Sequence, residues 1–124
     1  MFTQYSERYL MHRVQQLEHS ICTQGENKQT HWLDEYIALG LEYAQDAKAH
    51  NNPQQQENWL KRIYLTLAKA TQSLNLPQSW RLQCEDYLYQ PLFALKHLYM
   101  NQPQGDKAIC RLYRELSVNG RHLF

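Results

Sequence analysis

This chain of 124 residues is poor in glycine, in long apolar runs and in alternating β-type segments. Each shortage excludes a class of fold or a location. The chain has four glycines and no segment in which Val, Ile or Thr alternates with polar residues, so no β-sheet is expected. Its apolar runs fall well short of the ~18–20 residues that span a bilayer, so we expect no membrane partner. The N-terminus lacks the basic and apolar segments of a secretory signal, so a cytoplasmic location is expected.

Charge of one sign is also lacking. Thirteen basic and twelve acidic residues give a formal net charge of +1, and they are mixed along the chain, so no nucleic-acid partner is expected. Two strips of like charge stand out, one acidic and one basic. Three interpretations stay open: solvated faces, two helices that dock on each other, or surfaces for protein partners. The acidic strip lies on the second predicted helix and the basic strip on the fifth: Asp34, Glu35, Glu42 and Asp46, against Lys107, Arg111, Arg114 and Arg121.

Catalytic signatures are missing as well. The chain has no phosphate-binding glycine loop, dinucleotide fingerprint, HExxH, GxSxG or CxxC motif. It also lacks ExxH, which would supply half of a di-iron site in a helical bundle, and this favours a non-enzymatic protein. Three cysteines are expected to be reduced thiols, of which Cys84 and Cys110 should be at least partly buried.

What the chain does have is a repeated helical pattern. Apolar residues recur at three- and four-residue steps over 3–22, 30–49, 53–74 and 76–99, and again in a shorter segment that starts near Asp106 and stops at Asn119-Gly120. Leu74 is assigned an inward position. Because the connections are short, we predict an all-α fold, an up-and-down bundle of about five helices in a single domain over residues 1–124.

Two residues inside these helices are unusual. Pro91 lies within the fourth apolar pattern, which predicts a helix that continues through the proline with Leu88, Leu92 and Leu95 buried on one side. Gly40 lies inside the second helix and indicates close approach by a neighbouring helix or by a large ring. There leucine should overpack the contact, whereas alanine should be mild or even stabilising.

One constellation of side chains has the chemistry of a metal site. His19 and Cys22 are three residues apart, and His31 and Glu35 are four apart, so each pair lies on one side of its own helix. The short turn between the two helices brings both pairs to one end of the bundle. Nitrogen, sulfur and carboxylate ligands suit iron or zinc. The alternative is a solvated turn, because the apolar stripes direct His19 and Glu35 outward.

The fourth predicted helix and the residues just before it carry a distinctive set of side chains: Leu76, Pro77, Trp80, Arg81 and Cys84, followed by Pro91, Leu92, Ala94, Leu95 and Leu98. In these residues the segment resembles the FagA family of Fur-associated bacterial proteins, and with looser similarity elsewhere the resemblance covers about half the chain. The resemblance implies a cytoplasmic protein made under iron limitation, from genes near those of fumarase and superoxide dismutase. It carries over no catalytic residues.

These observations lead to three hypotheses. The first is a non-catalytic accessory protein of the iron-limitation response that binds a protein partner or an iron ion. The second is a redox protein or enzyme with an iron centre, which the missing ExxH motifs disfavour. The third is a helical chaperone or adaptor with no link to iron.

Overall fold

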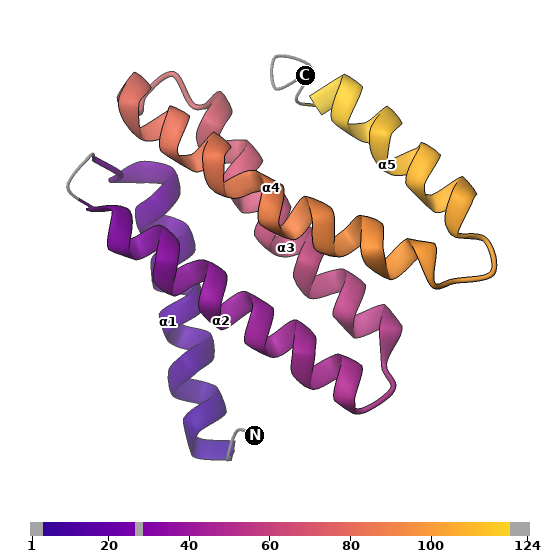
Figure 1. The fold of residues 1–124 in the computed structure, drawn as a ribbon. Helices are drawn as coiled ribbons and strands as arrows, with labels where there is room; N and C mark the ends of the chain where they lie inside the picture. Colours follow the sequence, from indigo (N-terminus) through magenta and orange to yellow (C-terminus); the bar gives the residue numbers. More distant parts are fainter. Residues whose placement is uncertain (1–3, 27–28, 120–124) are drawn as a thin grey trace.

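The computed structural model describes residues 4–26 and 29–119, and over these ranges the protein is an all-α bundle (Figure 1). The predicted fold class is confirmed, and the helices begin and end within a few residues of their predicted limits. Among the described residues none of the helices is long and apolar enough to cross a membrane. The five helices are α1 (Gln4–Thr23), α2 (Thr30–Ala49), α3 (Pro53–Gln72), α4 (Gln78–Met100) and α5 (Gly105–Asn119).

Helix α3 is the centre of the bundle, because it packs along both α2 and α4. Helix α1 crosses α2 and α3, and its N-terminal half diverges from the end of α2 (Figure 1). Helix α5 packs on α4, on the far side of the bundle from α1. Arg121 of the basic strip lies outside the described residues, and the rest of the strip is on a helix that packs on α4 rather than on α2. Docking of α5 on α2 is therefore not what holds α5.

The turn between α2 and α3 ends one helix and starts the next within a few residues. Asn51 takes a left-handed conformation with φ of 54°, which asparagine tolerates better than most residues. Asn52 caps α3, since its side-chain oxygen accepts a hydrogen bond of 3.1 Å from the backbone N–H of Gln55. Pro53 occupies the first turn, where its missing N–H costs nothing. This turn forms one wall of the groove described below.

The predictions made for Pro91 and for Leu74 can be compared with the structure. Pro91 does lie inside α4, and Leu88, Leu92 and Leu95 are buried, as predicted. The inward assignment of Leu74 is wrong, because α3 ends at Gln72 and Leu74 is exposed in the following turn.

Burial was predicted for Cys84 and Cys110, and the structure confirms it for one of them. Cys84 is buried in the core, where burial raises the pKa of its thiol to about 12. Cys110 is exposed, so its predicted burial is wrong. The reason is its place on α5, about 200° around the helix from Leu112, the residue that packs inward.

Trp80 closes one end of the core and ties α4 to α1. Its side chain is fully buried, and its indole N–H donates a hydrogen bond of 2.9 Å to the carbonyl of Ile21. That carbonyl lies in the last turn of α1, where backbone acceptors have no partner within the helix. Gly25 makes room for the indole, since a Cβ there would lie 1.8 Å from the Trp80 Nε1 atom.

Gly40 lies where α2 meets α3, as its position predicted. A Cβ built on it would be 2.4 Å from Cδ1 and 2.6 Å from Cγ1 of the fully buried Ile63. The helix-propensity gain from alanine is at most about 1 kcal/mol, and overpacking costs about 1–3 kcal/mol. We therefore expect Gly40→Ala to lower the free energy of unfolding by about 1 kcal/mol in urea titrations, rather than to be mild.

Ile63→Ala provides the control for this prediction, because it removes both the Cδ1 and the Cγ1 atom that the new methyl group would meet. In the Ile63→Ala background, Gly40→Ala should cost much less than in the wild type, or become stabilising. Equal costs in the two backgrounds would show that the contact with Ile63 does not govern this position.

Candidate functional site

The four predicted metal ligands do not converge. Among the residues that the structure describes, no three His, Cys, Asp or Glu side chains gather in a way that could hold a metal ion. Glu35 accepts two hydrogen bonds of 2.7 Å from the guanidinium of Arg13, which lowers the pKa of the Glu35 carboxyl. Cys22 instead faces α3, and its thiol donates to the carbonyl of Thr66 at 3.5 Å.

The separation of the two pairs follows from helix geometry. Cys22 follows Arg13 by nine positions, which places their side chains about 180° apart around α1. The α1 face that meets Glu35 is thus opposite the face that carries Cys22. His19 and His31 are both exposed. Binding of iron or zinc by this set stays a prediction, and it would require Glu35 to release Arg13.

His19 and Cys22 line a groove of their own between α1 and α3, with a volume of about 600 Å³. The other wall is formed by α3 and carries three cationic side chains: Lys61, Arg62 and Lys69. Burial raises the pKa of the Cys22 thiol. A raised pKa keeps the thiol protonated, so Cys22 lacks the thiolate character that a reactive cysteine needs.

A polar network joins α1, α2 and α3 beneath the surface. Arg62 donates two hydrogen bonds to Glu18, from Nε at 2.6 Å and from Nη2 at 2.7 Å. The hydroxyl of the fully buried Tyr36 lies 2.7 Å from the same carboxylate and 2.9 Å from the Thr66 hydroxyl. These groups satisfy one another, as buried polar groups in stable proteins do. The network is therefore a structural tie that positions three helices, and sequence analysis did not predict it.

The aromatic rings above this network form the floor of a second groove. The guanidinium of Arg62 lies 5.0 Å from the ring centroid of Trp59. Trp59 in turn stacks on Tyr43, with ring centroids 4.4 Å apart and planes only 9° from parallel. Stacked rings held by a cation on one side form a rigid apolar surface.

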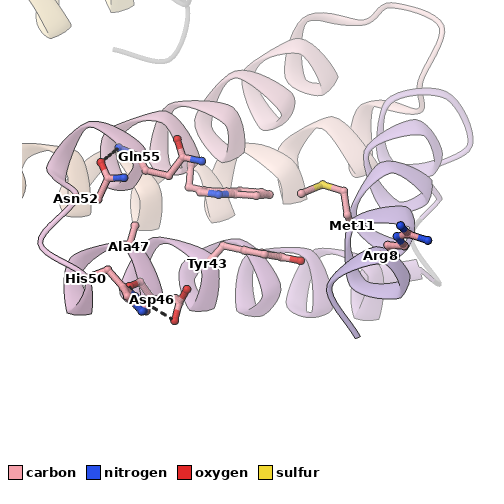
Figure 2. A pocket seen from close by; sticks show the side chains of 9 residues that line it. Arg8, Met11, Tyr43, Asp46, Ala47, His50, Asn52 and Gln55 are labelled. Atoms are coloured by element: carbon pink, nitrogen blue, oxygen red, sulfur yellow. Dashed lines mark hydrogen bonds and ion pairs between the residues drawn. The ribbon is translucent and has the colours of Figure 1, made fainter. Parts of the chain in front are cut away.

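This second groove, called here the Tyr43–Trp59 groove, has a volume of about 570 Å³. It lies where α1 diverges from the turn between α2 and α3, and Figure 2 shows Tyr43 in the floor and Met11 beside it, with polar side chains around the rim. An apolar floor with a few polar groups at the edge is typical of a binding site. Its lining residues are Arg8, Met11, Tyr43, Asp46, Ala47, His50, Asn52, Gln55 and Trp59.

The rim of the groove is polar and partly held in place. The His50 imidazole lies 2.8 Å from the Asp46 carbonyl and 3.7 Å from its carboxylate, an interaction drawn in Figure 2. Asn52 is fixed by its role as the cap of α3. The exposed rim residues Arg8 and Gln55 are available to meet a ligand. The groove thus has a rigid floor and a mixed polar rim, without a nucleophile paired to a base.

The sequence contained only a weak signal for this groove. Trp59 and Arg62 are three residues apart on one helix, a spacing that permits the cation–π contact. Tyr43 and Met11 come from two other helices, so their convergence on Trp59 depends on how the helices pack. No local pattern reports that packing.

Fold and groove together define a small all-α bundle with an aromatic surface groove. No protein family, curated protein or solved structure matches the chain in the comparisons made with each of these groups. The resemblance to the FagA family accordingly stays a prediction. The residues that carry it include Trp80, Cys84, Leu92 and Leu95, which are buried and shape the core rather than the groove.

Buried tyrosines make the bundle sensitive to alkali. Burial raises the pKa values of Tyr36, Tyr64 and Tyr99 above the usual 10.0, and the hydrogen bond from Tyr99 to Glu57 adds to its shift. Above pH 10 the unfolded chain loses these protons and the folded chain keeps them, so the free energy of unfolding should fall as pH rises. Urea titrations at neutral pH and above pH 10 measure the fall.

Tyr36→Phe tests the origin of this effect. It removes one group that releases its proton only on unfolding, so the decline above pH 10 should be shallower by up to about 1.4 kcal/mol per pH unit. The comparison uses the slope, because the lost hydrogen bonds of Tyr36 also lower stability at every pH. Identical slopes in the variant and the wild type would contradict the prediction.

Proposed function

We propose that this chain is a small, non-catalytic accessory protein of the bacterial iron-limitation response, acting in the cytoplasm by binding a protein partner. The observation that supports a binding role is the Tyr43–Trp59 groove, with its rigid aromatic floor and polar rim. The link to iron limitation rests on the resemblance of the fourth helix to the FagA family. Binding of an iron ion is the alternative form of the same proposal.

The groove favours a partner segment with an apolar anchor. A leucine, methionine or phenylalanine side chain would pack on the rings of Tyr43 and Trp59 and against the thioether of Met11. Rim groups such as Arg8 and Gln55 would then hydrogen-bond to the backbone or polar side chains of the same segment. This arrangement needs no chemistry at the groove, which agrees with a non-catalytic role.

Photo-crosslinking in cells tests the proposal. A benzoylphenylalanine in place of Gln55, on the rim, should give an adduct of defined mass in iron-starved cells. The same substitution at the exposed Gln72, at the other end of α3, is the matched control and should give none. Met11→Gln keeps the side-chain length but makes the floor polar, so it should weaken the adduct at position 55.

Three outcomes would count against the proposal. Equal adducts at both positions, or an adduct that does not respond to Met11→Gln, would remove the groove as the binding site. An adduct that is just as abundant in iron-replete cells would favour an adaptor unrelated to iron. Stoichiometric iron in protein purified without a tag would instead favour iron binding, either as the alternative form of the proposal or as an iron-centre protein.

A further inference from the structure

Helix α4 carries apolar side chains on two opposite faces. Its inner face packs in the core, but on the outer face Leu82, Phe93 and Met100 expose 53%, 63% and 62% of their surfaces. Tyr89 lies between them, with its ring centroid 6.1 Å from that of Phe93. A helix that is apolar on both faces packs against something on each of them.

The four outer residues form a straight row. At about 100° per residue, steps of about 7, 11 and 18 residues return to within about 20° of the starting direction. Leu82, Tyr89, Phe93 and Met100 therefore make one stripe about 27 Å long, called here the outer stripe. Scattered exposed apolar residues are ordinary, whereas a contiguous row of this kind marks an interaction surface.

Charged side chains border the outer stripe in an ordered way. Glu85 and Asp86 flank its first half, and Lys96 and His97 flank its second half. Glu85 and Lys96 lie on one side of the stripe, and Asp86 and His97 lie on the other, by the same helical geometry. The apolar residues are symmetric as well, since Leu82 and Met100 lie equally far from Pro91, as do Tyr89 and Phe93.

We propose that the outer stripe is a homodimer interface, on which a second copy of this chain packs its own α4 antiparallel about a two-fold axis near Pro91. That axis brings Glu85 beside Lys96 of the second copy and Asp86 beside His97 of the second copy. A parallel arrangement would instead place Glu85 beside Asp86 of the second copy, where the two like charges repel. The pattern is thus self-complementary in one orientation, as a two-fold interface requires.

Helix α5 positions one of the charged side chains that border this interface. The ammonium of Lys96 lies 5.7 Å from the ring centroid of Tyr113 on α5, which holds it on the Glu85 side of the stripe. A single helix pair of about 27 Å gives an interface near the lower end of the stable range. The dimer should therefore dissociate on dilution. This surface lies on α4, away from the Tyr43–Trp59 groove, and the inference does not depend on the proposed function.

Sedimentation velocity over a series of protein concentrations tests the apolar part. The wild type should shift from monomer to dimer as concentration rises, and Leu82→Ser with Phe93→Ser should remain monomeric. Leu65→Ser is the matched control, because Leu65 is equally exposed but lies on α3, and it should dimerise like the wild type. Circular dichroism melts establish that each variant is folded. A wild type that stays monomeric throughout, or a dimer insensitive to the stripe variant, would overturn the proposal.

A charge reversal tests the antiparallel orientation. Glu85→Lys should weaken dimerisation about tenfold, since the new lysine faces Lys96 of the second copy twice in a two-fold dimer. Lys96→Glu alone should weaken it similarly, and the double variant should restore the affinity. If each reversal weakens the dimer and the double variant fails to recover, the antiparallel pairing is wrong.

Discussion

Trp80→Ala is expected to lower the free energy of unfolding by about 3–5 kcal/mol, the largest loss for any single side chain of this bundle. The indole is fully buried, so its removal leaves a cavity at the end of the core. It also removes the 2.9 Å hydrogen bond to the carbonyl of Ile21, an acceptor in the last turn of α1. Equilibrium unfolding in urea, followed by circular dichroism, measures the loss.

Two further variants separate the packing of Trp80 from its fit against the turn. Trp80→Phe keeps much of the apolar volume but not the donor, so it should cost clearly less than Trp80→Ala. Gly25→Ala should be destabilising in the wild type, because the new Cβ would lie 1.8 Å from the indole nitrogen. In the Trp80→Ala background it should cost less, since alanine lacks the three indole atoms that lie within 2.3 Å of that Cβ. Additive costs, or a Trp80→Ala loss below about 1 kcal/mol, would contradict this account.

The helices were predictable because their signals are local. Periodic apolar residues and the caps at Asn52 and Pro53 act within a few residues, so the limits of α2 and the start of α3 were read correctly. The errors fall where a helix ends or where a neighbour decides burial. Leu74 continues the apolar spacing but lies beyond the end of α3, and Cys110 lies on the side of α5 that no helix in the described chain buries.

The site was less predictable, because spacing shows which side chains share a face but not what that face meets. His31 and Glu35 do share a side of α2, yet the cation of Arg13 on α1 occupies Glu35. The Tyr43–Trp59 stack has the same origin, since its rings come from helices whose relative rotation no local pattern gives. The outer stripe of α4 is different. Its spacing is visible in the sequence, and the structure adds that α3 and α5 leave it exposed.

The second large effect is expected at the polar network. Glu18→Ala should lower the free energy of unfolding by about 2–3 kcal/mol, because it leaves Arg62 and the buried Tyr36 hydroxyl without their shared acceptor. Because Arg62 is partly exposed to water, the expected loss is smaller than for a fully buried ion pair. Urea titrations of the single variants and of Glu18→Ala/Arg62→Ala complete a double-mutant cycle.

The ion pair of Arg13 with Glu35 is the matched control for this cycle. It also ties α1 to a neighbouring helix through two short hydrogen bonds, but its side chains are part-exposed and no buried hydroxyl depends on it. Glu35→Ala should therefore cost less than about 1 kcal/mol. In the Glu18 cycle, the double variant should lose less free energy of unfolding than the two single losses add up to. The difference should be at least about 1 kcal/mol, because removing both charges leaves neither unpaired. Equal losses for Glu18→Ala and Glu35→Ala would show that the network holds the three helices no more tightly than an ordinary surface ion pair does.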